Sequence, residues 1–300
     1  MANGIGLIGR AGPQGRGALL TALIMLPPAL AVFTLFVVLP IGEAAWYSVF
    51  NWDGFGIPTR FLGLTNYMSV LGNTTFTSAV IHNFLIIGVS LALQLPLALG
   101  MALLLSRNRI GTVTFRLIFF MPYILADVAA GLIWRFVFDG DYGLVSGISK
   151  LLGGGPVYLL ADPHLAFSAV LVVVVWKYFG FYMMLYIAGM QSIDRGLYEA
   201  AEIDGASALQ RFRHITIPQL GPMIRLSIFF SIVGSLQFFD MIVPLTGGGP
   251  LNSTHTMVSF LYYFGITRMR VGFGSAIGVI LFVVCVTFAF GYRRLFMRHD

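Results

Sequence analysis

Six long apolar runs dominate the chain, and each is about as long as a membrane-crossing helix. A spanning helix needs roughly 20 mostly apolar residues, and backbone polar groups in lipid must be satisfied within regular structure. The runs are continuous rather than alternating, as helices require. The pattern therefore predicts an all-α polytopic membrane protein with six transmembrane helices, at about residues 19–39, 79–105, 113–138, 165–190, 221–245 and 272–292.

The distribution of arginine and lysine predicts the orientation, because cytoplasmic loops carry an excess of both. With a cytoplasmic N-terminus, the inner segments hold Arg10, Arg16, Arg107, Arg109, Arg116, Arg195, Arg211, Arg213, Arg225, Arg293, Arg294 and Arg298. The outer segments hold only Arg60, Lys150, Arg268 and Arg270. Both termini, with tails at 1–18 and 293–300, are therefore expected in the cytoplasm, as is the loop at 191–220.

Composition supports a membrane location and excludes several functions. The chain is 58% hydrophobic and 10% charged, whereas soluble domains carry about a quarter charged residues. Its basic residues are scattered, so no nucleic-acid surface is expected, and the single Cys285 leaves no disulfide framework or thiolate metal site. There is no GxxxxGK[ST] phosphate loop, so we expect no ATP hydrolysis by this chain and no cofactor of its own.

The longest polar interval in the second half of the chain is EAAEIDGASALQRFRHITIP, residues 199–218. Ser192 or Asp194 can cap a first short helix, and Ser207 can cap a second. Between them, Gly205 permits a turn that a larger residue would resist. We expect a helix–turn–helix at the membrane surface. The residues alone allow either an amphipathic interfacial helix or a docking element.

The prolines and arginines of this interval lead to two further expectations. Pro218 and Pro222 should end the second helix and admit the fifth apolar run. Arg211 and Arg213 lie off its apolar edge, so we expect them to be solvated or lipid-facing charges.

The spacing within this interval resembles the signature loop of ABC-importer permeases, EAA-x3-G-x9-I-x-L-P. The matching residues here are Glu199-Ala200-Ala201, Gly205, Ile215 and Ile217-Pro218, with Ile217 standing where leucine is usual. Further segments resemble the carbohydrate-uptake branch that includes the maltose and glycerol-phosphate permeases: NWDGF, MPYI, DYGL, QSI, YEAAEIDGAS and LTGGGP. The resemblance covers nearly the whole chain.

The resemblance implies an ABC type I importer permease fold in a prokaryotic plasma or inner membrane. In that family the signature loop is a coupling element that docks in a cleft of a cytoplasmic ATPase subunit. The implied partners are a second homologous permease, two ABC ATPase subunits that bind ATP and Mg, and an extracytoplasmic solute-binding protein. The outer loops at 51–58 and 247–250 would face that binding protein. The implied coupling residues are Glu199, Ala200, Ala201, Asp204 and Gly205.

Charged residues interrupt three of the apolar runs. Asp127 lies in the third run, Lys177 in the fourth and Asp240 in the fifth, and ionisable residues inside spans are functional candidates by default. For Asp127 and Lys177, the alternative is a mutual buried pair that only fixes helix packing. Asp240 is nearer the outer end of its span, where a role in helix packing or gating is the alternative to ligand contact. Arg135 is also near the outer end of its span, where its side chain can reach the interface.

The resemblance to maltose-type permeases adds substrate positions, because sugar contacts in that family lie in the third, fourth and fifth spans. By sequence spacing, the sugar-contact positions of that family correspond here to Tyr123, Asp127, Lys177, Tyr178, Ser231, Ser235 and Phe238. Tyr123 and Asp127 are expected to be i, i+4 neighbours on one helix, as are Ser231 and Ser235, with Phe238 one turn later on the same face. Aromatic rings with hydroxyl groups suit a polyhydroxylated ligand. Ordinary packing of the rings and close helix approach at the serines are the alternatives.

These features predict a permease subunit, not an enzyme, that moves a sugar or polyol through the membrane. The charges at Asp127 and Lys177 depart from the maltose-type pattern, so the solute could also be an amino or acidic sugar or a phosphorylated polyol. An ion-coupled secondary transporter is the alternative, and it would predict inverted repeats, of which we find none. A membrane metalloenzyme lacks support, because the five histidines show no HExxH-like spacing.

Overall fold

The computed structural model of the chain describes residues 13–106 and 111–296, and most of its regular structure is helical. The label η marks a π-helical segment. Before the gap lie α1 (Pro13–Phe33), η1 (Thr34–Val38), α2 (Leu39–Tyr47), β1 (Phe50–Asn51), β2 (Arg60–Phe61), α3 (Thr65–Leu71), α4 (Thr74–Val89), η2 (Ser90–Gln94) and α5 (Leu95–Leu105). After it lie α6 (Thr112–Ile124), α7 (Asp127–Val137), α8 (Leu144–Leu151), α9 (Ala166–Gln191), α10 (Arg195–Ile203), α11 (Ala208–Arg211), η3 (Phe212–Thr216), α12 (Ile217–Gln219), α13 (Gly221–Leu236), α14 (Ile242–Leu245), α15 (Met257–Phe260), η4 (Leu261–Ile266) and α16 (Val271–Phe296).

The apolar runs form helices that are long enough to cross a membrane. Four are long and apolar enough to cross a membrane: Leu20–Tyr47, Thr74–Leu105, Ala166–Gln191 and Val271–Phe296. Two bent helix pairs bring the number to six if each pair counts as one span. The all-α polytopic class expected from the sequence is confirmed.

The helix ends differ from the expected ones chiefly at the N-terminus. The first helix begins at Pro13, inside the expected tail, and stays helical to Tyr47, beyond the expected end at 39. The rest of that tail, residues 1–12, lies outside the described residues. So do Arg107 and Arg109, and so do residues 297–300, which include Arg298 and the end of the expected C-terminal tail.

The third expected span, 113–138, is not one straight helix. α6 and α7 meet at a bend of 100°, where two extended residues separate them. Pro122 removes one helical hydrogen bond before the bend, and Lys177 of α9 binds the carbonyls that the bend leaves free. Tyr123 and Asp127 therefore lie on different helices, and the prediction that they are i, i+4 neighbours on one helix is wrong.

The fifth expected span, 221–245, is not one helix: α13 ends at Leu236, and only the short α14 (Ile242–Leu245) follows within that range. The side-chain amide of Asn83, on α4, donates to the carbonyls of the last two residues of α13. Such a tertiary partner satisfies the helix end, and the chain then leaves the helical path. Phe238 lies past this end, so the prediction that it continues the helical face of the two α13 serines is wrong.

The most buried of the four membrane-length helices, α9, packs along both α5 and α6. Its approach to α6 depends on Gly180, because a Cβ atom there would come within 1.8 Å of the Phe119 carbonyl oxygen. Small residues allow helix backbones in membranes to pack this closely. On the other side of the bundle, α13 packs against α4 and α16.

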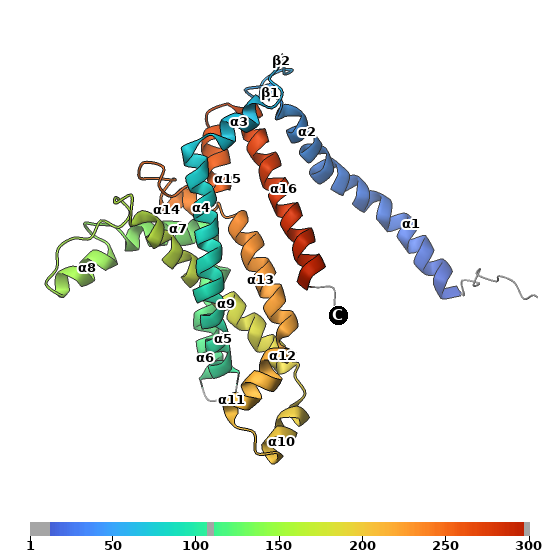
Figure 1. Cartoon of the computed structure of the whole chain (residues 1–300), viewed down its shortest axis with the longest axis vertical. Helices are drawn as coiled ribbons and strands as arrows, with labels where there is room; N and C mark the ends of the chain where they lie inside the picture. The colour runs from blue at the N-terminus through green and yellow to red at the C-terminus, as the bar shows by residue number, and fades with distance from the viewer. Residues whose placement is uncertain (1–12, 107–110, 297–300) are drawn as a thin grey trace, which may run out of the picture.

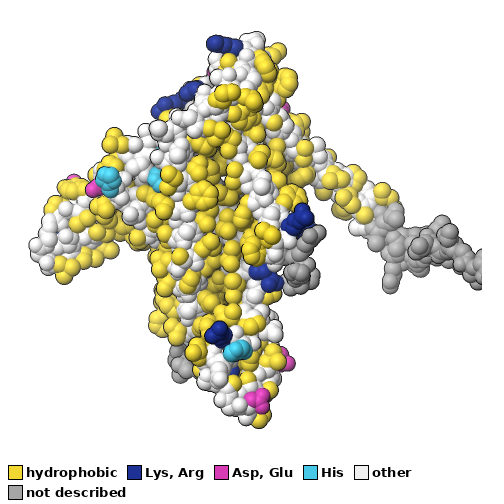
Figure 2. All heavy atoms as spheres, in the orientation of Figure 1, with side chains coloured by type: hydrophobic (Ala, Val, Ile, Leu, Met, Phe, Trp, Pro, Cys, Tyr) yellow, Lys and Arg dark blue, Asp and Glu magenta, His cyan; other side chains and the backbone are white. Residues whose placement is uncertain are grey.

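Polar features gather toward the two ends of this bundle. The helices α10 to α12 lie at one end, and the short hairpin of β1 and β2, with α3 beside it, lies at the other (Figure 1). Figure 2 shows hydrophobic side chains covering the length between them, with most charged side chains toward the ends. The helix from α1 to α2 points away from the bundle (Figure 1), and its most apolar window is 0% buried.

Candidate functional site

A cavity of about 340 Å³ lies between the helices α4, α6, α9 and α13 and the segment η2. Small-molecule sites in proteins commonly measure about 300–1,000 Å³. The lining residues are Ile86, Ser90, Gln94, Tyr123, Val174, Tyr178, Phe181, Tyr182, Phe230, Ser231, Gly234, Ser235 and Phe238. Five of the seven predicted substrate contacts are among them, and the remaining two, Asp127 and Lys177, are not.

Aromatic rings and serine hydroxyls both contribute to the cavity wall. The Tyr123 ring stacks on Phe181 with centroids 4.7 Å apart and meets Tyr178 edge-on at 6.2 Å. From α13 come two buried serines, of which Ser235 donates its hydroxyl hydrogen to the backbone carbonyl of Ser231 at 2.7 Å. Flat ring faces beside hydroxyl groups suit a ligand that has apolar faces and a polar edge.

Sequence reasoning missed two polar residues of this wall, Ser90 and Gln94. Both are buried and lie four residues apart in η2, within the second span. The signal that could have found them is a pair of polar residues at i, i+4 inside an apolar run, since such residues share one helix face.

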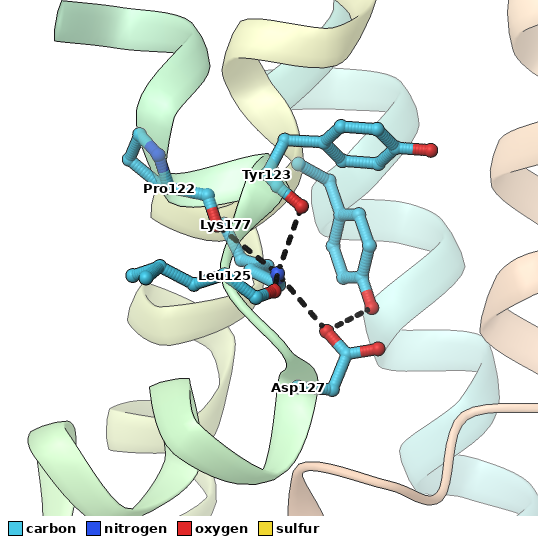
Figure 3. Close-up of polar contacts among 6 residues, drawn as sticks. Pro122, Tyr123, Leu125, Asp127 and Lys177 are labelled. Carbon is cyan, nitrogen blue, oxygen red and sulfur yellow. Dashed lines mark hydrogen bonds and ion pairs between the residues drawn. The ribbon is translucent and has the colours of Figure 1, made fainter.

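A charged cluster closes the bend between α6 and α7. The ammonium of Lys177 donates to the carbonyl oxygens of Pro122 at 3.0 Å, Tyr123 at 3.1 Å and Leu125, and lies 3.3 Å from Asp127 Oδ1 (Figure 3). Its side chain is only 2% exposed. The mutual pair that the sequence left open beside substrate contact is therefore present in the structure.

The pair is placed where two helix dipoles favour it. The ammonium lies at the C-terminus of α6, which carries partial negative charge, and Asp127 begins α7, whose N-terminus carries partial positive charge. Tyr178 donates its hydroxyl hydrogen to the same Asp127 oxygen at 3.1 Å. Through this bond the charged cluster positions one of the rings that line the cavity.

The polar interval after α9 folds as a helix, a turn and a second helix. Asp194 caps α10 by accepting the backbone N–H of Gly196, and Ser207 caps α11 in a reciprocal capping box with Gln210. Gly205 has φ +75°, a conformation that glycine adopts without strain. The expected caps and turn are confirmed.

The second helix of this interval continues past its expected end. α11, η3 and α12 are continuous up to Gln219, and Pro218 lies in the first turn of α12. The proline is tolerated there because the π-helical segment before it has already displaced the regular hydrogen-bond ladder. The change of direction is a bend of 64° between α12 and α13. The expectation that Pro218 ends the helix is wrong.

The two helices are tied together by polar contacts. Arg211 forms an ion pair with Glu202 of α10, and the Tyr198 hydroxyl is 2.9 Å from Thr216 Oγ1. Arg211 is 20% exposed, so the expectation of a solvated or lipid-facing charge is wrong for it. Arg213 is exposed as expected.

The predicted coupling residues line the outer surface of this helix pair. Glu199, Ala200, Asp204 and Gly205 are exposed, and Ala201 is half-buried. On the inner side, a cleft of about 720 Å³ separates the pair from the ends of α5 and α9. Among the residues that the structure describes, most of this outer surface is therefore left uncovered.

At the opposite end of the bundle, the segment 246–256 forms a tight loop around a buried imidazole. Gly248 has φ +85°, and a Cβ atom there would lie 2.0 Å from the ring of His255. Burial lowers the pKa of His255 to about 4, and the charges of His82 and Arg268 act in the same direction. The imidazole is therefore neutral at physiological pH, and its packing under the glycine does not depend on pH there.

Comparison with known proteins gives consistent matches. The family described as binding-protein-dependent transport system inner membrane component matches residues 94–299. The chain is 35% identical to the trehalose/maltose transport system permease protein of Thermococcus litoralis, over 91% of this chain and 92% of that protein. It is 32% identical to the sulfoquinovosyl glycerol transport system permease protein of Agrobacterium fabrum, over 95% of this chain and 92% of that protein.

The fold also matches solved structures. One is a chain of a bacterial alginate ABC transporter in complex with an alginate pentasaccharide-bound periplasmic protein. It superimposes with a TM-score of 0.80 at 22% identity, and the match covers 93% of this chain and 94% of that one.

Proposed function

Because this chain belongs to the binding-protein-dependent inner membrane components, the permease subunits of ABC importers, we propose that it carries a sugar or a related polyol into the cytoplasm. The observation that supports this solute class is the cavity among α4, α6, α9 and α13, with its rings and hydroxyl groups. The proposed contacts there are Tyr123, Tyr178, Ser231, Ser235 and Phe238.

The charged pair beside the cavity has a different proposed role. Lys177 does not line the cavity, and its ammonium is occupied by three carbonyls and Asp127. We assign both residues to holding the bend between α6 and α7, so that they influence solute binding through the position of Tyr123 and Tyr178. This replaces the direct contact expected from the sequence.

The proposed energy source is a pair of ABC ATPase subunits that engage the outer surface of α10 and α11. Alongside Glu199, Ala200, Ala201, Asp204 and Gly205, this surface carries two strongly exposed apolar side chains, Ile203 at 87% and Leu209 at 73%. Exposed apolar side chains on a polar, tightly capped helix pair favour a protein partner. In this arrangement the segment 191–220 and both termini are cytoplasmic.

The complete importer would contain a second homologous permease and an extracytoplasmic solute-binding protein. The loop at 246–256 and the hairpin of β1 and β2 lie at the end of the bundle opposite α10 (Figure 1). We propose that this end receives the binding protein. The ATPase subunits and the binding protein must dock on opposite sides of the membrane, and the two proposed docking surfaces lie at opposite ends of the bundle, as this requires.

The proposed function is tested by uptake into vesicles that contain the complete importer. Accumulation of a sugar or polyol should require the binding protein outside and ATP inside, and it should persist when an ionophore collapses the ion gradients. Uptake that needs an ion gradient but neither ATP nor the binding protein would instead support a secondary transporter.

The coupling surface gives a separate prediction. Gly205→Pro should lower ATP-driven uptake at least about tenfold, because a strained backbone at φ +75° costs about 1–3 kcal/mol and 1.4 kcal/mol is a factor of ten. The proline also removes the N–H that donates to Glu202. Glu199→Lys, which reverses a charge on the same surface, should act in the same direction.

The measurement is ATP-driven uptake together with co-purification of the ATPase subunits with the permease. Gly196→Ala is the matched control, since that glycine lies within α10 and an added Cβ would make only ordinary contacts, at 3.5 Å or more. Normal uptake by both the Gly205 and the Glu199 variants would exclude this surface as the coupling element.

A further inference from the structure

Gln94 is a buried amide with an unused hydrogen-bond donor. Its side chain is 1% exposed and lines the central cavity, and its Nε2 atom has no hydrogen-bond partner among the described residues. Buried polar groups in folded proteins nearly always have a partner, and an unsatisfied one is destabilising. An unpaired donor on a residue that lines a cavity of ligand size points to a partner that arrives with the ligand.

The backbone around Gln94 departs from a regular α-helix. Gln94 ends the π-helical segment η2, and Pro96 follows at the start of α5. Because proline has no backbone N–H, the regular hydrogen-bond ladder is interrupted there, and a π-helical turn accommodates the interruption. Single π-helical turns inside spans occur frequently at functional sites.

The cavity wall carries hydrogen-bonding groups but no formal charge. Among the described residues that line it, none is Lys, Arg, Asp, Glu or His. The nearest cation to consider is Lys177, whose three N–H donors already serve three carbonyls and Asp127. An anionic ligand would therefore lose its hydration without gaining a counter-charge, which is strongly unfavourable.

We propose that Gln94 donates a hydrogen bond to the transported solute, and that this solute is an electrically neutral sugar or polyol. The inference rests on the proposed function and narrows it, because the sequence left acidic sugars and phosphorylated polyols open. The neutral amide of Gln94 matches a sugar hydroxyl or ring oxygen, while the rings of Tyr123 and Phe181 can cover an apolar sugar face.

The charge of the solute is tested with the complete importer in vesicles supplied with its binding protein and ATP. One mixture contains neutral mono- and disaccharides and polyols, and the other contains glucuronate, sialic acid and sn-glycerol 3-phosphate. We expect ATP-dependent accumulation from the neutral mixture alone. Accumulation of an anion overturns the inference but leaves the proposed importer intact. Accumulation from neither mixture counts against the proposed function itself.

The role of Gln94 is tested with Gln94→Leu, measured with the sugar that accumulates. We expect kcat/KM for uptake to fall about tenfold, the effect of one lost hydrogen bond of about 1.4 kcal/mol. The Tm of the purified complex should rise by about 2–4 °C, because an unsatisfied buried amide is replaced by an apolar group. If Gln94 only stabilised the fold, the Gln94→Leu variant would have a lower Tm than the wild type. A lower Tm together with normal uptake would overturn the assignment.

Two further variants keep this test decisive. Gln94→Asn retains the amide but withdraws it by one methylene, so uptake should fall while the complex assembles normally. Leu93→Met, at a neighbouring position of η2 whose side chain is 48% exposed, is the control and should change neither uptake nor Tm. Wild-type uptake by both Gln94 variants would exclude the residue from the solute site.

Discussion

Replacing Lys177 with methionine is expected to destabilise the protein by about 3–5 kcal/mol, the usual effect of removing one partner from a buried ion pair. Methionine has nearly the length of lysine, so little packing is lost. What is lost is the charged donor for three carbonyls at the bend, and Asp127 loses the ammonium with which it pairs. The Asp127 side chain is 31% exposed, so the effect should lie toward the lower end of that range.

The measurement is the Tm of the purified permease in detergent, followed by ATP-driven uptake of the variant that assembles. Lys150→Met is the matched control, because this exposed lysine of α8 donates only to the backbone carbonyl of Asp141. Its effect should stay within about 0.5 kcal/mol. An unchanged Tm for the Lys177 variant would contradict the assigned role at the bend.

The double variant Lys177→Met with Asp127→Asn separates the ion pair from the carbonyl contacts. Removing both charges should be less destabilising than the sum of the two single changes, because neither partner is left buried and unpaired. The carbonyl contacts remain lost, so stability should not return fully. Because the pair holds the bend beside the cavity, the change at Asp127 should affect both assembly and solute uptake.

Gly180→Ala is the second change with a large expected effect, at about 1–3 kcal/mol or more. The added Cβ would come within 1.8 Å of the Phe119 carbonyl oxygen and 2.6 Å of its carbon. These are backbone atoms, so α6 as a whole must move away from α9. Because α6 carries Tyr123 into the cavity and supplies the carbonyls that Lys177 binds, uptake should fall together with stability.

Gly100→Ala is the matched control for this change. Gly100 lies in α5, and apart from the neighbouring backbone of its own helix no atom of the described residues lies within 4 Å of the position that its Cβ would take. Alanine there should stabilise the protein by about 0.5–1 kcal/mol, because glycine is unfavourable inside a helix. Thermal unfolding of both purified variants is the measurement. Similar Tm values for the two would show that close packing of α6 on α9 does not limit stability.

Much of the molecule could be predicted from local pattern. The membrane-length helices follow from runs of apolar residues, because lipid requires a continuous apolar surface and internal backbone hydrogen bonds. The caps at Asp194 and Ser207 and the turn at Gly205 were also predicted, since each depends only on residues within one helical turn. Four of the five predicted contacts that line the cavity are there for a related reason: they lie on helices that the pattern predicted, whereas Phe238 follows the end of α13.

The sequence by itself therefore determined the helical class, the membrane-length runs and the fold of the segment after α9. Tertiary structure decided where two of those runs change direction. α6 ends because Lys177 of another helix binds its free carbonyls, and α13 ends because Asn83 does the same.

Tertiary contacts also paired Arg211 with Glu202 and assembled the cavity whose wall includes Gln94. An apolar run shows that a helix can form, but the partners of its polar groups come from segments distant in sequence. Those partners, through hydrogen bonds made in a medium without water, decide where each helix ends and which side chains meet the solute.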